Sequence, residues 1–300
     1  MKPLLTVFTP AFNRADCLRH CYESLRKQTC RDFIWLVVDD GSSDGTGDMV
    51  KEWMRAGELE IQYHYKENGG MHTAHNAAYE LVSTELNVCL DSDDRMPEDA
   101  VASILQFWAR HGSDRVAGMA GLDADAATGE LIGTPFKEDA GETTLNGFYA
   151  AGGRGDKKLV YRTALMKQLP PYPVFPGEKY VGLGYKYMLA DRLAPLLTMN
   201  KVLCLVEYRE DGSSRNMFRQ YVLNPMGFAF LRKEGMRYQP ARRRRFMEAV
   251  HYVSASLLAR NPRFLRESPR PFLTLAAIPF GVALMCLILV KNRKGKGGGK

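Results

Sequence analysis

The sequence lacks paired cysteines and a recognisable secretory leader. Its six cysteines form no CxxC pair and have no histidine at metal-ligand spacing; they stand at positions 17, 21, 30, 89, 204 and 286. Structural zinc sites and disulfide frameworks depend on such spacings, so neither is expected here. The first residues lead into a short strand-like segment, without a long apolar run or a small-residue cleavage site. We therefore expect reduced thiols in a chain that stays in the cytosol.

Positive charge is scarce over most of the chain and concentrated at its end. Residues 231–300 hold sixteen Lys and Arg against three acidic residues, whereas residues 1–230 hold 25 against 31. Aromatic residues do not alternate with these cations as they do in nucleic-acid-binding segments, so we expect no nucleic-acid partner. A basic segment of this kind favours an anionic membrane surface.

The same basic residues flank an uncharged run of twenty residues, 271–290. A helix of that length crosses a hydrocarbon core of about 30 Å, although Pro279 and Gly281 interrupt the run. Three arrangements stay open: a re-entrant or interfacial segment, a single span, and a core helix of a soluble domain. In a membrane, cations on both sides favour the cytoplasmic side for both flanks.

The first 120 residues alternate short apolar runs with segments of helical period. The strand-like runs are 4–9, 34–39, 61–65, 88–90 and 116–120, and the helical segments between them are 15–27, 45–55, 71–82 and 97–111. This alternation predicts an α/β fold in which helices flank a mostly parallel sheet. Beyond it we expect mobile loops and short strands over 123–155, then helices at 159–169, 178–189, 218–233 and 247–259.

Polar clusters follow four of the predicted strands. They are Pro10–Asn13, Asp39–Thr46, Lys66–Gly70 and Asp91–Asp94. Ligands of open α/β sheets bind at the carboxyl ends of the strands, so four successive polar loops at that edge predict one binding site.

Two of these clusters have a specific chemistry. Asp91 and Asp93 project to the same side of a strand end, where Mg²⁺ or Mn²⁺ can share its coordination between them and a substrate diphosphate. The alternative is an acidic cap on the helix that begins at Pro97. Asp40 can accept a hydrogen bond from a base or a ribose, and the alternative is an ordinary turn.

The loop before the third helix offers an anion site. Asn68, Gly69 and Gly70 precede the helix start, where backbone N–H groups favour a negative charge. The loop has neither a Walker lysine nor a full GxGxxG spacing, so the signal for phosphate is weak. His72 and His75, on the first turns of the same helix, are read as packed polar residues rather than as ligands.

Four segments together resemble the family 2 glycosyltransferases of GT-A fold, of the bacterial cell-surface polysaccharide type. They are TPAFNR at 9–14, VVDDGSSDGT at 37–46, ENGGMHTAHNAA at 67–78 and LDSDD at 90–94, and they cover about the first third of the chain. The resemblance implies a Rossmann-like nucleotide-binding sheet, a UDP-sugar donor and a divalent metal. It also implies that Asp93 binds the metal directly, together with Asp91.

The resemblance carries further residues into the donor site. Those expected to contact the nucleotide are Pro10, Phe12, Asn13, Asp40, Lys66, Asn68, Gly69, Asp91, Ser92 and Arg215. Met71 departs from the pattern, since a Lys or Arg is expected there, which places one phosphate contact in doubt.

Members of this family usually invert the anomeric centre, and inversion needs a carboxylate base for the acceptor hydroxyl. Glu178, in the segment FPGEKY, is the first candidate, and Asp156 is the second. The alternative for Glu178 is a cap on a helix that begins at Lys179.

The expected organisation is a GT-A domain over 1–215, divided into a nucleotide-binding half (1–120) and an acceptor half (121–215). A helical basic extension follows at 216–270, and a membrane-associated segment with a basic tail at 271–300. The expected acceptor is a glycan or a lipid-linked saccharide. A catalytically inactive sugar-nucleotide-binding homologue stays open as an alternative. A nucleotidyltransferase is less favoured because no glycine-rich triphosphate loop follows the first strand, and the chain lacks the QxxRW element of processive synthases.

Overall fold

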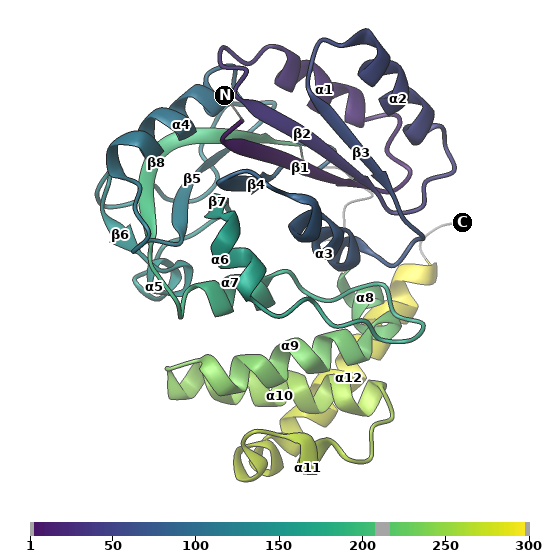
Figure 1. Ribbon diagram of the computed structural model, residues 1–300. Coiled ribbons are helices and arrows are strands. Elements are labelled where there is room, and N and C mark those ends of the chain that lie inside the picture. Colours follow the sequence, from purple (N-terminus) through teal and green to yellow (C-terminus); the bar gives the residue numbers. More distant parts are fainter. Residues whose placement is uncertain (1–2, 208–216, 298–300) are drawn as a thin grey trace. The chain divides into compact units, whose positions relative to one another are not determined.

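The chain forms two compact units in a computed structural model that describes residues 3–207 and 217–297 (Figure 1). The sheet unit comprises residues 3–171 and 186–207, and the helical unit comprises residues 172–185 and 217–297. Residue 215, where we expected a domain boundary, lies outside the described residues.

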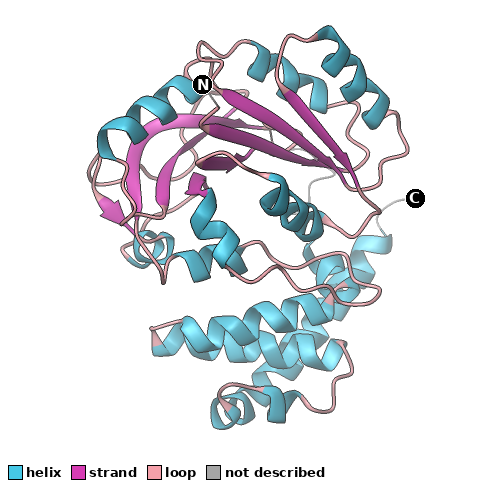
Figure 2. Ribbon diagram, viewed as in Figure 1, coloured by secondary structure: helices cyan, strands magenta, loops and turns pink. Residues whose placement is uncertain are grey.

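The sheet unit is built on one mixed sheet of eight strands (Figure 2). The strands are β1 (Leu5–Ala11), β2 (Phe33–Asp39), β3 (Ile61–Tyr65), β4 (Leu86–Cys89), β5 (Gly118–Asp125), β6 (Glu142–Thr143), β7 (Lys157–Arg162) and β8 (Leu196–Val206). Their order is β3-β2-β1-β4-β7-β5-β8-β6, in which the first four are parallel, β7 is antiparallel to both its neighbours, β5 and β8 are parallel, and β6 is antiparallel. The predicted α/β fold with a mostly parallel sheet is confirmed.

Helices cover both faces of this sheet (Figure 1). On one face lie α1 (Leu18–Arg26), α2 (Thr46–Ala56) and α4 (Ala100–His111); on the other lie α3 (Met71–Leu81) and α6 (Thr163–Gln168). Two shorter helices are α5 (Leu145–Ala150) and α7 (Gly184–Ala190).

An aromatic cluster fills the core beneath α1 and α2. Trp35 of β2 is fully buried, and its ring centroid lies 6.0 Å from Tyr22 and 5.8 Å from Trp53. Its indole N–H donates to the Thr9 hydroxyl at 3.0 Å, so the polar edge of the ring is satisfied inside the core. The cluster ties α1 and α2 to the sheet.

The structure corrects three expectations for the second half of the chain. Residues 159–169 were expected to form one helix, but 157–162 form β7 and only Thr163–Gln168 are helical, because β7 completes the sheet between β4 and β5. The helix expected at 178–189 begins only at Gly184, and the one expected at 218–233 is divided before Pro225. Strand β8 was not foreseen.

The helical unit contains α8 (Met217–Leu223), α9 (Pro225–Tyr238), α10 (Arg242–Leu258), α11 (Phe264–Glu267) and α12 (Pro271–Gly297). Helix α10 packs against both α9 and α12. Met236, Val250, Val253 and Ala277 form the centre of this core and are buried. The helical C-terminal extension predicted from the sequence is therefore present.

Two glycines show how closely backbone segments approach in the sheet unit. Gly155 has φ +73°, and a Cβ on it would lie 2.3 Å from the Ile132 carbonyl oxygen. Gly57 has φ +70° but has open space at the same position. We predict that Gly155→Ala lowers the free energy of unfolding by about 3 kcal/mol, because backbone strain and a backbone clash add.

Gly57→Ala, which carries the strain without the clash, should cost about 1 kcal/mol. Urea unfolding followed by the fluorescence of the buried tryptophans measures both variants. Equal losses for the two would show that the close approach at Gly155 has no energetic consequence.

Candidate functional site

The site is built at the carboxyl edge of the parallel strands. β1 lies between β2 and β4, and the chain leaves β1 toward β2 and β3 before returning to β4 on its other side. Phe8 of β1 pairs with Cys89, the last residue of β4, so the loop that follows β4 begins beside the last residues of β1. Such a reversal of strand order opens the crevice in which α/β sheets bind ligands.

The loop after β1 is locked to the loop after β2. The Asn13 backbone N–H donates to the Ser42 hydroxyl at 2.9 Å, and the Asn13 side-chain oxygen accepts from the Ser43 N–H at 2.8 Å. Asn13 has φ 52°, a conformation that asparagine adopts more readily than most residues. The neighbouring Phe12 is 46% exposed, so this fixed loop presents an aromatic ring to solvent.

Asp40 is the organising residue of the site. Its carboxylate is buried and accepts hydrogen bonds from the backbone N–H groups of Gly69 (3.0 Å) and Gly70 (2.7 Å), and from the Asn68 amide (3.2 Å). It also forms an ion pair with Lys66, whose ammonium group reaches the Glu67 carbonyl and the Thr73 hydroxyl as well. These contacts fasten the loop before α3 to the end of β2.

This arrangement bears on the anion site predicted for the Asn68-Gly69-Gly70 loop. The backbone N–H groups that were expected to face a phosphate instead hold an anion of the protein itself, the Asp40 carboxylate. Lys66 is likewise engaged by Asp40. The roles of these residues toward a nucleotide stay predictions.

Asp39, the residue before Asp40, connects the loop after β2 with β3. It accepts from the Ser42 N–H at 2.8 Å and from the Tyr63 hydroxyl at 2.7 Å. Burial, and then the hydrogen bond to Asp39, raise the pKa of Tyr63. Asp39 thus holds the loop that follows β2.

Half-buried and buried residues alternate in the DSDD segment after β4. Ser92 and Asp94 are buried, whereas Asp91 and Asp93 are half-buried. The Asp94 carboxylate accepts from the Glu207 N–H and the Cys204 thiol, each at 3.3 Å. Asp94 therefore anchors the segment to the end of β8.

A lysine that the sequence analysis missed completes this anchor. The Lys158 ammonium nitrogen, on β7, lies 3.7 Å from the Asp94 carboxylate and donates to the Cys89 carbonyl at 3.4 Å. Burial raises the pKa of Asp94 to about 6, while the positive charge of Lys158 acts in the opposite direction. Only the pairing of β7 with β4 brings this lysine beneath the segment, so no local sequence signal could identify it.

The donor set at this point fits a divalent metal held partly by substrate. No cluster of three or more potential protein ligands occurs within residues 3–207 and 217–297. Asp91 and Asp93 are the half-buried carboxylates of the segment, and Asp91 accepts from the Cys89 thiol at 3.6 Å. Mg²⁺ and Mn²⁺ sites of nucleotide enzymes often use one or two carboxylates and complete their coordination with phosphates and water.

The two candidate bases have different environments. Both Glu178 carboxylate oxygens accept backbone N–H groups at 2.8 Å, from Met226 and Gly227. Glu178 therefore caps α9, and not a helix beginning at Lys179. Burial raises the pKa of Glu178, while the two backbone N–H groups lower it.

Asp156 is exposed in the sheet unit, and Arg215 lies outside the described residues.

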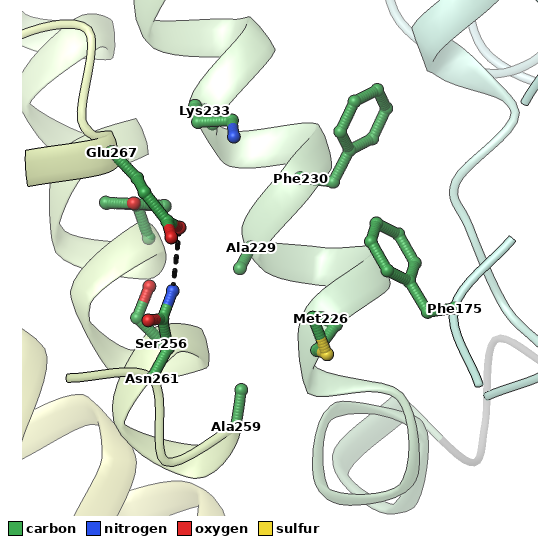
Figure 3. Close-up of a pocket in the computed structure, with 10 residues that line it drawn as sticks. Phe175, Met226, Ala229, Phe230, Lys233, Ser256, Ala259, Asn261 and Glu267 are labelled. Atoms are coloured by element: carbon green, nitrogen blue, oxygen red, sulfur yellow. Dashed lines mark hydrogen bonds between the residues drawn. The ribbon is translucent and has the colours of Figure 1, made fainter. Parts of the chain in front are cut away.

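The helical unit holds a small cavity of about 100 Å³ (Figure 3). It is lined by Phe175, Met226, Ala229, Phe230, Lys233, Tyr252, Ser256, Ala259, Asn261 and Glu267. Pockets for drug-sized ligands have roughly 300–1,000 Å³, so this cavity is too small for a nucleotide sugar. None of the predicted donor-site residues lines it.

The first part of the chain is similar in sequence to known glycosyltransferases. A profile of the glycosyl transferase family 2 matches residues 6–126. The putative teichuronic acid biosynthesis glycosyltransferase TuaG of Bacillus subtilis is 32% identical over 106 residues, or 35% of this chain and 42% of TuaG. Glycosyltransferase GlyA of Streptococcus pneumoniae serotype 4 is 31% identical over 114 residues, or 38% of this chain and 16% of GlyA. The chain thus spans less than half the length of these relatives.

Solved structures are similar over nearly the whole chain. S. aureus TarS 1–349 in complex with UDP-GlcNAc gives a TM-score of 0.61 at 20% identity and covers 98% of this chain and 92% of TarS 1–349. The mannosyltransferase PcManGT of Pyrobaculum calidifontis, in complex with GDP-Man and Mn²⁺, gives 0.57 at 17% identity, with 97% and 87% coverage. At these identities the likeness shows the fold. Residues 6–126 thus match the glycosyl transferase family 2 profile, and the chain has the fold of these glycosyltransferase structures.

Proposed function

We propose that this chain transfers a sugar from a nucleotide-diphosphate donor, a UDP-sugar, to a hydroxyl group of a glycan or lipid-linked acceptor. One observation carries the proposal: the half-buried Asp91 and Asp93 follow β4, at the same carboxyl edge of the sheet as the loops that Asp40 orders. UDP-GlcNAc in TarS and the profile match over residues 6–126 support a nucleotide-sugar donor.

Different residues of this chain would bind different parts of the donor. The exposed Phe12 ring offers a surface on which a base can stack, beside the fixed Asn13. Asp93, with Asp91, would hold Mn²⁺ or Mg²⁺, which neutralises negative charge on the departing diphosphate. Lys158 and Asp94 hold the segment that carries these carboxylates, because their ion pair connects it to β7.

Transfer with inversion requires that a carboxylate take the proton of the acceptor hydroxyl while its oxygen attacks the anomeric carbon and the nucleoside diphosphate leaves. Glu178 is our first candidate for this base, and its raised pKa suits proton uptake. Asp156 is the second candidate. It follows Gly155, where the backbone passes close to Ile132.

We also propose that the protein works at the cytoplasmic side of the cytoplasmic membrane. The described residues include one helix long and apolar enough to cross a membrane, Pro271–Arg293. Its basic flanks favour anionic lipid, and a membrane position suits a lipid-linked acceptor. The relatives TuaG and the teichoic acid poly(glycerol phosphate) polymerase of Staphylococcus epidermidis are named for cell-surface polymers.

The donor site predicts metal-dependent stabilisation by UDP. At a ligand concentration of one hundred times Kd, binding contributes about 2.7 kcal/mol, or a rise in Tm of about 5 °C for a chain of this size. Thermal shift with UDP, GDP, CDP and ADP, each with Mn²⁺, Mg²⁺ or EDTA, measures it. We expect the largest rise for UDP with Mn²⁺ or Mg²⁺, and Asp93→Asn should lose the metal-dependent part.

Asp48→Asn is the matched control, because Asp48 is an exposed acid on α2. It should keep the full shift. If no nucleotide raises the Tm of the unmodified chain under any metal condition, the donor-site proposal is wrong.

If Glu178 is the base, replacing it should stop sugar transfer but leave donor binding intact. Glu178→Gln should keep the UDP-dependent thermal shift and lower UDP release from UDP-sugars roughly 100-fold or more. It should also cost about 1 kcal/mol of stability, because a carboxamide cannot accept from both N–H groups of α9. UDP release is therefore measured well below the Tm of the variant.

Asp156→Asn is the companion variant. Full activity in Glu178→Gln together with a loss in Asp156→Asn would transfer the role of base to Asp156. Donor binding without UDP release in the unmodified chain would instead identify a catalytically inactive sugar-nucleotide-binding homologue.

A further inference from the structure

Helix α12 is apolar around its whole circumference, yet only one side of it is covered. The segment Pro271–Arg293 has a mean hydropathy of 2.6, but only 22% of it is buried. A core helix of a soluble domain would be mostly buried, so the structure argues against that alternative for residues 271–290.

The covered side is a narrow stripe that packs on α10 (Figure 1). Its buried members are Thr274, Ala277, Gly281 and Ile288, spaced by three, four and seven residues. A Cβ on Gly281 would lie 2.5 Å from the Val253 side chain of α10, so the two helices touch closely there. The stripe runs along most of the apolar segment.

The opposite side exposes large apolar side chains over the same length. Phe272 is 89% exposed, and Phe280, at the margin of this side, is 57% exposed although its ring centroid lies 5.7 Å from that of Phe246 on α10. The remaining large apolar side chains exposed on this helix are Leu275, Val282, Leu287, Leu289 and Val290. This is a continuous apolar face, which we call the α12 face.

Helix α10, against which α12 packs, cannot enter a hydrocarbon core. It begins with Arg242, Arg243, Arg244 and Arg245, and its Glu248 pairs with Arg232 of α9 at 3.2 Å. Charged groups are costly at the bilayer centre. A transmembrane α12 would therefore have to draw these charges into the bilayer or separate from α10 and lose the packing at Gly281.

Exposed cations lie in the chain on both sides of the apolar segment of α12. Exposed basic residues lie on α11 and beside both ends of the apolar segment; they are Arg260, Arg263, Arg266, Arg270, Lys291 and Arg293. The acids of this part of the chain are few, and Glu234 and Glu248 are already paired with Arg237 and Arg232. The charge around the face therefore complements anionic phosphate headgroups.

We propose that the α12 face lies in the plane of an anionic bilayer surface, with its side chains at the boundary of headgroups and acyl chains, while the other side of α12 stays packed on α10. This selects the interfacial arrangement over a single span. It deepens the membrane attachment proposed above and rests on it, but it is independent of sugar transfer.

Flotation of the full chain with vesicles tests the attachment. We expect binding to phosphatidylglycerol-containing vesicles, and weaker binding to pure phosphatidylcholine vesicles and at high salt. Phe272→Glu with Phe280→Glu should weaken binding at least about 10-fold, because each replaces an apolar side chain of the α12 face with a charged one that is unfavourable among acyl chains. Leu193→Glu, an exposed apolar position in the sheet unit, is the control and should bind normally.

Tryptophan depth measurements test the orientation. Phe272→Trp, Phe280→Trp and Leu287→Trp are each bound to vesicles with bromines at different acyl positions. The native Trp35, Trp53 and Trp108 are at most 9% exposed and provide a constant background. An in-plane helix places all three probes at one shallow depth, although their outermost positions lie about 22 Å apart along the axis.

A deep Phe280→Trp between two shallow probes would overturn the in-plane arrangement and establish a span. No flotation would overturn both the arrangement and the attachment, while the UDP thermal shift would still report on the transferase site. Binding that is equal on neutral and anionic vesicles would overturn the role of the cations. Dimerisation that the paired Glu variants abolish, without vesicle binding, would assign the α12 face to a second copy of the chain.

Discussion

The binding edge of the sheet unit depends on one buried carboxylate. Asp40 ends no strand and caps no helix, yet it accepts from Gly69, Gly70 and Asn68 and pairs with Lys66. A buried carboxylate is stable only when such donors surround it. The loop after β2 and the loop before α3 are therefore held together by groups of the protein itself.

A second buried carboxylate, Asp94, holds the acidic segment after β4 in place. Asp94 and Lys158 connect that segment to β8 and β7, two strands that join the sheet only late in the chain. Asp91 and Asp93 are thus left at the surface of a fixed loop. Two adjacent carboxylates repel each other, and the nearby Lys158 charge lowers the cost of holding them together.

The helical unit differs from the sheet unit in how its charged and apolar groups are arranged. Helices α9 and α10 bury charged groups in pairs, whereas α12 offers an apolar surface wider than α10 can cover. An uncovered apolar face of this length is unfavourable in water. The basic residues around it indicate the surroundings in which that face is stable.

The sequence by itself determined the elements with local signals. Apolar runs and helical periods marked β1 to β5 and α1 to α4, and four polar clusters marked the binding edge, because strand ends and helix starts are encoded in neighbouring residues. Tertiary structure decided the rest. Residues 157–162 became β7 only through pairing with β4 and β5, Glu178 became the cap of α9 rather than of its own segment, and Asp40 rather than a phosphate received the N–H groups of Gly69 and Gly70. In each case the deciding partner lies far away in the chain, where local patterns carry no information.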